Sequence, residues 1–80
     1  MRDLDEHDLV QVRHLRTPDR DVEGTTGISR QPIVGDRGAI VHVLDQANFL
    51  VECVDDDGYT VWLSQFHRDE LELIQVCRPR

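Results

Sequence analysis

The chain has 80 residues, of which 39% are hydrophobic and 31% charged, a composition typical of a folded globular protein and not of a disordered one. A chain of this length predicts a single domain over residues 1–80, whose small core leaves no room for a large internal active site. Sixteen acidic residues against nine arginines give a net charge of −7, which argues against binding to nucleic acids and to anionic membrane surfaces.

The N-terminal segment Met1–Asp8 is acidic and contains no apolar run. We therefore expect neither a secretory signal nor a transmembrane segment, and we expect a cytoplasmic location. In that compartment disulfides are rare, so Cys53 and Cys77 are expected to be reduced thiols. Cys53 lies within a strand pattern, which favours a role as a small core residue.

The first predicted strand is Leu9–Leu15, where Val10 and Val12 share one face and alternate with polar residues. Residues 16–31 are mostly polar and predict a long loop. Loops of this length in small domains are usually functional or mobile. The loop is therefore either part of a binding surface or a disordered insertion tolerated at the surface.

A two-glycine turn within Pro32–Leu44 leads into the second predicted strand, Ala39–Leu44. Gly35 and Gly38 allow a positive φ angle or a close approach of two backbones. Apolar residues occupy both alternating positions of this strand, so we expect it to bend across two sheets or to be covered by a neighbour. The following elements are a turn at Asp45–Asn48 and two strands, Phe49–Val54 and Tyr59–Ser64.

The faces of the apolar residues predict the register of the hairpin between the third and fourth strands. If Val51 and Cys53 share a face with Val61, the loop contains an odd number of residues. A loop of Asp56–Gly58 satisfies this and puts Gly58 where a left-handed residue is required. The predicted pairs are Cys53 with Val61, Val51 with Leu63, and Glu52 with Trp62. This register places Leu50, Val54 and Trp62 on the opposite, outer face.

After Ser64 the two-residue period is lost, and we expect a single helical turn within Gln65–Glu70, a final strand at Leu71–Ile74 and a tail at residues 77–80. Five short strands with a long first loop predict an all-β fold, a small and strongly bent five-stranded barrel with its core between about residues 9 and 75. The predicted core residues are Val10, Val12, Val41, Val43, Val51, Cys53, Val61, Leu63 and Leu71.

Three segments of the chain, Val34–Val41, Val51–Gly58 and Asp69–Leu71, follow the pattern Gly-Asp-x-Gly-x-Val-Val, Val-Glu-Phe-x-Asp-x-x-Gly and Asp-x-Leu. This pattern resembles a family of short bacterial proteins of unknown function with an SH3-like barrel. The resemblance implies that fold and no particular activity. The chain differs from the family in Cys53, which replaces the usual aromatic residue, and in its longer first loop. Short stand-alone chains of this kind also resemble products of mobile gene cassettes.

Four features could carry chemistry, but their patterns favour structural roles. Gly35–Gly38 lacks the Gly-Lys-Ser/Thr ending of a phosphate-binding loop. The consecutive aspartates of Asp55–Gly58 do not have the alternating spacing of a calcium loop, and the four histidines and two cysteines lack the short paired spacing of zinc sites. His67–Glu70 has no recognisable nucleophile beside it. We therefore expect no catalytic residue, no metal and no cofactor.

These observations favour a non-enzymatic protein-binding or assembly module that uses its outer β face and its long first loop. The acidic charge suits a basic partner. A second copy of the chain is the simplest alternative, because two-fold dimers are the commonest oligomers. Two other roles remain open: an accessory or regulatory subunit of a larger enzyme, and an antitoxin-like or immunity-like protein that caps a basic protein. The candidate interface consists of Ile40, Leu44, Leu50, Val54 and Trp62; the alternative for Trp62 is a position beneath the long first loop.

Overall fold

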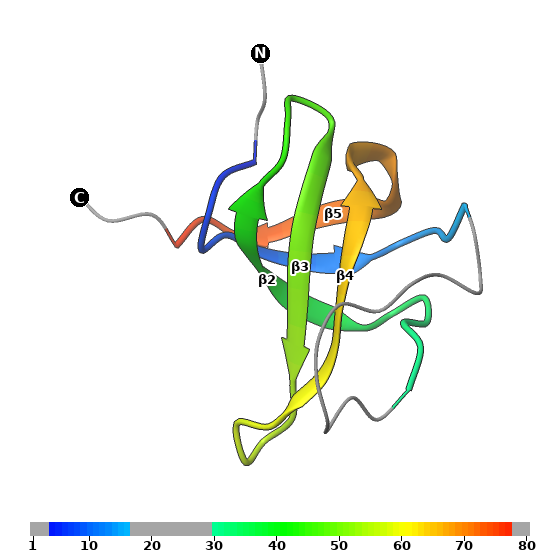
Figure 1. Cartoon of the computed structure of the whole chain (residues 1–80), viewed down its shortest axis with the longest axis vertical. Helices are drawn as coiled ribbons and strands as arrows, with labels where there is room; N and C mark the ends of the chain where they lie inside the picture. The colour runs from blue at the N-terminus through cyan, green and yellow to red at the C-terminus, as the bar shows by residue number, and fades with distance from the viewer. Residues whose placement is uncertain (1–3, 17–29, 78–80) are drawn as a thin grey trace.

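The computed structural model describes residues 4–16 and 30–77. Its five strands form one antiparallel sheet in the order β4-β3-β2-β1-β5, which confirms the all-β prediction (Figure 1). Within the described residues β4 and β5 are not joined, so hydrogen bonds do not close the sheet into a barrel. The elements are β1 (Leu9–Val12), β2 (Arg37–Val43), β3 (Asn48–Val54), β4 (Thr60–His67), the 3-10 turn η1 (Arg68–Glu70) and β5 (Leu71–Gln75).

Two of the sequence predictions fall mostly on parts of the chain outside the described residues. They are the long loop at residues 16–31, which is described only at its ends, and the tail at residues 77–80. The expected helical turn before the last strand is present as η1. In the part of the chain that the structure describes, no helix is long and apolar enough to cross a membrane.

Gly35, before β2, and Gly38, within β2, have the two roles that the sequence suggested. Gly35 has a φ of 100°, in the region that favours glycine, and its N–H donates a hydrogen bond of 2.8 Å to the carbonyl of Val12. At Gly38 a Cβ atom would lie only 2.6 Å from the carbonyl oxygen of Glu52. The first glycine therefore allows the turn, and the second allows β2 to approach β3 closely.

A bulge in β2 explains why its apolar residues occupy both alternating positions. Ile40 pairs with Val51 and His42 pairs with Leu50, which leaves Val41 as the additional residue. Ile40 is buried, whereas Val41 is exposed. Figure 1 shows β2 as a curved strand that follows β1 at one end and β3 at the other. The bend expected from the sequence is therefore achieved with one bulge.

The β3–β4 hairpin has the predicted three-residue loop. The N–H of Asp55 donates to the carbonyl of Tyr59 at 2.9 Å, and these two residues enclose Asp56–Gly58. Gly58 has a φ of 86°, the left-handed conformation that was expected. The carboxylate of Asp55 accepts hydrogen bonds from the N–H groups of Asp57 and Tyr59. The first aspartate of this acidic segment therefore stabilises the turn.

The register beyond this loop differs from the prediction because β4 also contains a bulge. Val54 pairs with Thr60, but Cys53 pairs with Trp62, so Val61 is an additional residue in β4. One additional residue moves every following side chain to the other face of the strand. The predicted pairs of Cys53 with Val61, Val51 with Leu63 and Glu52 with Trp62 are therefore wrong by one residue.

The core lies where β1 and β5 cross behind β3 and β4 (Figure 1). Trp62 is fully buried and lies beside Phe66, with their ring centroids 5.2 Å apart. Five residues of the predicted core are buried: Val10, Val12, Val51, Cys53 and Leu71. Val43 and Val61 are half-buried and pack against this cluster. The prediction is wrong for Val41, which is exposed, and for Leu63, which lies on the other side of the sheet. Leu4, Ile40, Phe49, Trp62 and Phe66 complete the core instead.

Val51 and Val54 lie on opposite faces of β3 and provide a matched pair of substitutions. We expect Val51→Ala to lower the free energy of unfolding by about 1 to 3 kcal/mol, because it leaves a cavity in the core. Val54→Ala makes the same change at an exposed position and should alter the free energy of unfolding by less than about 0.5 kcal/mol. Chemical denaturation followed by Trp62 fluorescence measures both values. Equal losses would contradict the assignment of faces.

Candidate functional site

One side of β2, β3 and β4 faces away from the core, and we call it the outer face. Residues paired across antiparallel strands share a side of the sheet. Glu52 pairs with Ala39 of β2 and with Leu63 of β4, while the neighbouring Val51 and Cys53 are buried on the other side. By the same rule, His42 and Gln65 lie opposite Leu50, and Thr60 lies opposite Val54. The outer face is formed by apolar residues, Ala39, Val41, Leu50, Val54 and Leu63, and by polar ones, His42, Glu52, Thr60 and Gln65.

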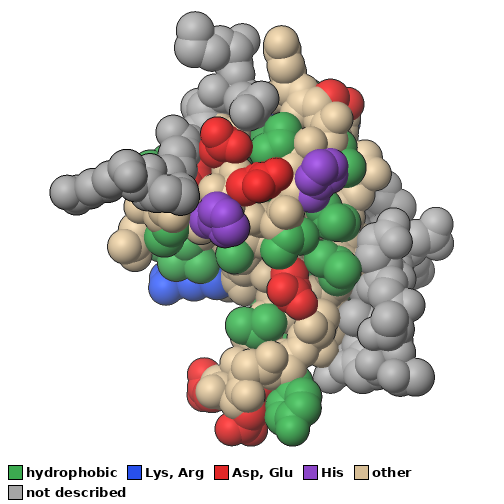
Figure 2. All heavy atoms as spheres, turned by 60° about the vertical axis from the view of Figure 1, so that its left-hand side comes forward, with side chains coloured by type: hydrophobic (Ala, Val, Ile, Leu, Met, Phe, Trp, Pro, Cys, Tyr) green, Lys and Arg blue, Asp and Glu red, His purple; other side chains and the backbone are tan. Residues whose placement is uncertain are grey.

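Apolar side chains make up most of the outer face. Val41 is 40% exposed and Val54 is 51% exposed, while Leu50 and Leu63 are half-buried. At the tip of the β3–β4 hairpin, Tyr59 is 72% exposed. Figure 2 shows hydrophobic side chains gathered in the middle of this side of the molecule, with acidic and histidine side chains among them. Contiguous apolar patches on a small protein are typical of binding surfaces.

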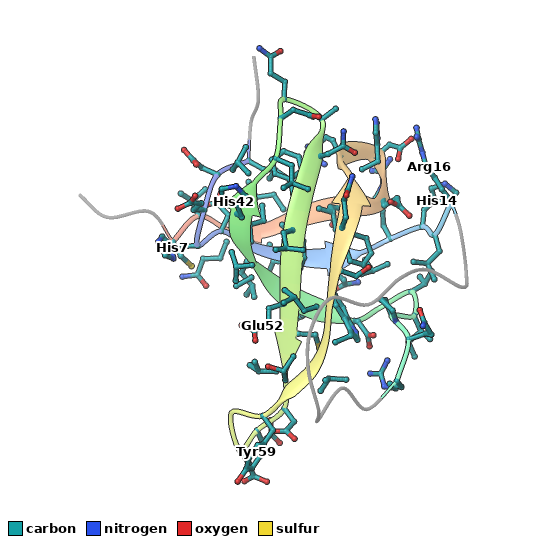
Figure 3. The ribbon with its side chains drawn as sticks, in the orientation of Figure 1. His7, His14, Arg16, His42, Glu52 and Tyr59 are labelled. Carbon is teal, nitrogen blue, oxygen red and sulfur yellow. The ribbon has the colours of Figure 1, made fainter. Side chains whose placement is uncertain are left out.

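Glu52 is the acidic residue of the outer face, which also contains the ionisable His42 opposite Leu50. Its side chain is half-buried, and its Oε2 accepts a hydrogen bond of 2.6 Å from the hydroxyl of Thr60. Its partners in the register, Ala39 and Leu63, are both apolar. Figure 3 shows Glu52 on the same side of the molecule as His42, with Arg16 on the opposite side.

Two of the five residues predicted for the interface belong to the core. Ile40 and Trp62 are both 0% exposed, so the prediction that they lie on the outer face is wrong. The bulges at Val41 and Val61 turn these two side chains inward. The other predicted residues lie outside the core: Leu50 and Val54 are on the outer face, and Leu44 is exposed just after β2.

The structure adds Val41, Leu63 and Tyr59 to the surface that the sequence suggested. The alternation of β4 alone predicts that Leu63 faces the core, because the bulge at Val61 is not visible in the local pattern. One signal could have corrected the register. Trp62 is the largest apolar side chain in a chain with few aromatics, and a register that buries it gains more than one that buries Val61.

Trp62 is held in the core by Asp36, in the turn before β2. The indole Nε1–H donates to Asp36 Oδ2 at 2.8 Å, and the N–H of Ile33 donates to the same oxygen at 3.0 Å. Arg30 donates to both carboxylate oxygens, at 2.7 and 2.9 Å. The Gly35–Gly38 segment therefore uses its one carboxylate within the fold.

These contacts alter the pKa values of the two charged groups. Burial, the largest single effect, acts to raise the pKa of Asp36, but it is outweighed by hydrogen bonds from Arg30, Ile33 and Trp62 and by the charge of Arg30. The pKa of Asp36 is therefore lowered. The hydrogen bond to Asp36 raises the pKa of Arg30. Asp36 thus remains charged and paired in the folded protein at neutral pH.

The histidines do not assemble a metal centre within the described residues, where no group of three or more histidine, cysteine or acidic side chains is suited to hold an ion. Figure 3 shows His7 and His42 on one side of the molecule and His14 on the other. His42 Nδ1 lies 3.6 Å from Glu6 Oε2, and both side chains are exposed.

His67–Glu70, which could have suggested acid–base catalysis, forms the cap of η1. The N–H of Asp69 donates to His67 Nδ1 at 3.2 Å, and the N–H of His67 donates to Glu70 Oε1 at 2.9 Å. Glu70 is buried, and its Oε2 accepts from the N–H of Arg16. Arg16 also pairs with Asp69 at 2.6 Å, a contact that lowers the pKa of Asp69. This arrangement joins the end of β4 to the start of the first loop.

The chain matches no protein-family model, no curated protein and no solved structure. The candidate site therefore rests on the geometry and charge of the chain itself.

Asp36 should stabilise the fold only when it is charged. Because its pKa is lowered on folding, its contribution is present above the ordinary value of 3.8 and is lost as the pH falls through the lower folded value. We expect Asp36→Asn to cost about 1 to 3 kcal/mol at neutral pH. Below pH 3.8 the variant and the wild type should approach each other. Urea denaturation of the variant and the wild type, at neutral pH and below pH 3.8, measures the difference in their free energies of unfolding.

The control is Asp56→Asn at the exposed tip of the β3–β4 hairpin, which should change stability by less than about 0.5 kcal/mol. If the difference between Asp36→Asn and the wild type were independent of pH, the proposed role of the Asp36 charge would be wrong.

The two free thiols should differ in reactivity. Cys53 is buried, and its burial, followed by the charge of Asp36, raises the pKa of its thiol. Cys77 is exposed. Because the thiolate is the reactive form, iodoacetamide should modify Cys77 rapidly in the folded protein and Cys53 only after unfolding. Mass spectrometry of the modified chain, with Cys77→Ser as the control, measures this. Equal rates at both cysteines would contradict the buried position of Cys53.

Proposed function

We propose that the protein is a non-enzymatic protein-binding or assembly module of the bacterial cytoplasm that acts through the outer face of β2–β4. The observation that supports this most directly is the exposure of Val41 and Val54 beside the half-buried Leu50 and Leu63. These residues lie on adjacent strands of one sheet, so their side chains form a continuous apolar surface. Covering such a surface with a partner removes apolar area from water and favours association.

The finer fold assignment is part of this proposal. We infer that the curved sheet is an SH3-like barrel, in which β1 and β5 cover the side of the core opposite β3 and β4. The shared core cluster, the tight β3–β4 hairpin and the short turn η1 before β5 support this assignment. Such a barrel encloses a filled core, so binding takes place on its outside.

Two carboxylates that could perform acid–base chemistry, Asp36 and Glu70, are engaged in contacts that hold the fold together. Glu70 caps η1 and holds the N–H of Arg16, while Asp36 holds Arg30 and Trp62. These contacts explain why acidic residues are buried in so small a protein. They support a binding role over an enzymatic one.

A matched pair of double variants tests the use of the outer face. Val41→Ser with Val54→Ser removes its two most exposed aliphatic side chains. Ile33→Ser with Val34→Ser makes a comparable change on the turn before β2, where both residues are also exposed. We expect the first pair to weaken self-association or partner binding by about tenfold or more, and the second pair to leave both unchanged.

Light scattering at increasing protein concentration measures self-association, and capture from a lysate of the source organism measures partner binding. Thermal unfolding of both variants establishes that they remain folded. If the wild type stays monomeric and the two variants capture the same proteins as the wild type, the outer face is not the binding surface.

A further inference from the structure

We propose that the occupant of the outer face is a cationic segment of another protein, one that places an arginine or lysine against Glu52 and covers the surrounding apolar side chains. This inference rests on the proposed function, because it names the chemistry of the partner at the same surface. The observations that favour it are the position of Glu52, the pairing of the protein's own arginines and the charge around the outer face.

Glu52 lies between apolar neighbours on all three strands of the outer face. Ala39 and Leu63 are opposite it in the register, and Leu50 and Val54 are the next outward residues along β3. Its Oε2 accepts a hydrogen bond from the hydroxyl of Thr60, which is a neutral donor. A partner that covers the apolar side chains must also remove water from this carboxylate. A buried carboxylate is costly unless it is paired, so the partner must supply a cation or strong hydrogen-bond donors.

The protein does not supply that cation from the described residues. Arg16 donates to the carboxylate of Asp69 and Arg30 to that of Asp36. Arg13 donates to the backbone carbonyl of Asp69, Arg37 to the side chain of Gln11 and Arg68 to the carbonyl of Leu71. None of these arginines forms an ion pair with Glu52, and the ionisable His42 of the outer face lies beside Glu6 instead. Figure 3 shows Arg16 far from Glu52, on the other side of the molecule.

Most of the charged side chains near the outer face are acidic, like Glu52. Asp55, Asp56 and Asp57 follow directly after Val54 at the tip of the hairpin, and Glu6 lies beside His42 at the other end. Figure 2 shows red carboxylates along this side of the molecule and one blue basic group near its edge. Such a field attracts a cationic segment and increases its rate of association.

A second copy of the chain does not meet these requirements. Two outer faces in contact around a two-fold axis would bring Glu52 and the hairpin aspartates of both copies into one interface. Like charges opposed across an interface disfavour the complex. Tyr59, exposed beside the aspartates, instead offers an aromatic ring on which an arginine or lysine can stack.

The test uses one defined peptide, acetyl-Leu-Arg-Val-Arg-Leu-Arg-amide, and two counterparts with glutamine or glutamate at the three arginine positions. Backbone amide NMR spectra of the full chain locate the binding site and give the affinity. We expect the arginine peptide to perturb the amides of β2, β3 and β4 around the outer face, to bind more tightly than the glutamine peptide, and to lose affinity with added salt. The glutamate peptide should not bind.

Glu52→Gln keeps an oxygen for the hydroxyl of Thr60 and removes only the charge. We expect this substitution to lower the affinity for the arginine peptide by about tenfold. That is the loss expected when the acceptor of a charge-assisted hydrogen bond becomes neutral. The control, Glu72→Gln at an exposed position of β5, makes the same change away from the outer face and should leave the affinity for the arginine peptide within about twofold of the wild-type value. Thermal unfolding verifies that both variants are folded.

Two results would overturn the inference in different ways. Equal binding of the glutamine and arginine peptides at the outer face, with no effect of Glu52→Gln, would leave the binding surface in place and remove the cationic requirement. Shifts confined to Asp55–Asp57, or no shifts with any peptide, would show that cations do not bind at Glu52. The serine variants of Val41 and Val54 test the outer face independently of either result.

Discussion

The rest of the structure depends on the hydrogen bond from the Trp62 indole to the Asp36 carboxylate. A buried indole N–H needs an acceptor, and Asp36 provides one from a turn that precedes β2. The backbone of the same residue joins that turn to β1, since the N–H of Val12 donates to the Asp36 carbonyl at 2.8 Å. Asp36 therefore connects its own turn to both β1 and β4, two strands that are not neighbours in the sheet. The largest side chain of the core is thereby fixed in one position.

Three bulges contribute to the curvature that lets a single sheet enclose this core. The additional residues are Val41 in β2, Val61 in β4 and Ile74 in β5. Bulges increase the local twist and bend a strand, so the sheet can curve around its own inner face without a second layer of structure. They also direct side chains: Ile40 and Trp62 turn inward. The shape of the protein and the composition of its outer face have the same cause.

The internal pairing of arginines shapes the electrostatics of the surface. Arg30 neutralises Asp36, and Arg16 holds Asp69 at the other end of the first loop. Because these cations are engaged within the fold, the carboxylates of Glu52 and the β3–β4 hairpin are left facing solvent together with the apolar residues of the outer face. A surface that combines apolar area with unneutralised negative charge is suited to a partner that is apolar and cationic.

The sequence by itself determined the strands, their order along the chain, the loop of the central hairpin and the places of the glycines. These features depend on local alternation and turn chemistry, so Gly58 could be assigned to a positive φ from its neighbours alone. For Gly35 and Gly38 the same chemistry gave two possible roles, and the structure assigns one to each glycine. The tertiary structure decided which face of each strand is buried. That choice depends on the bulges at Val41 and Val61 and on the acceptor that Asp36 offers to Trp62, contacts between residues distant in the chain. A single additional residue reverses a face, and the local pattern of β4 does not record it.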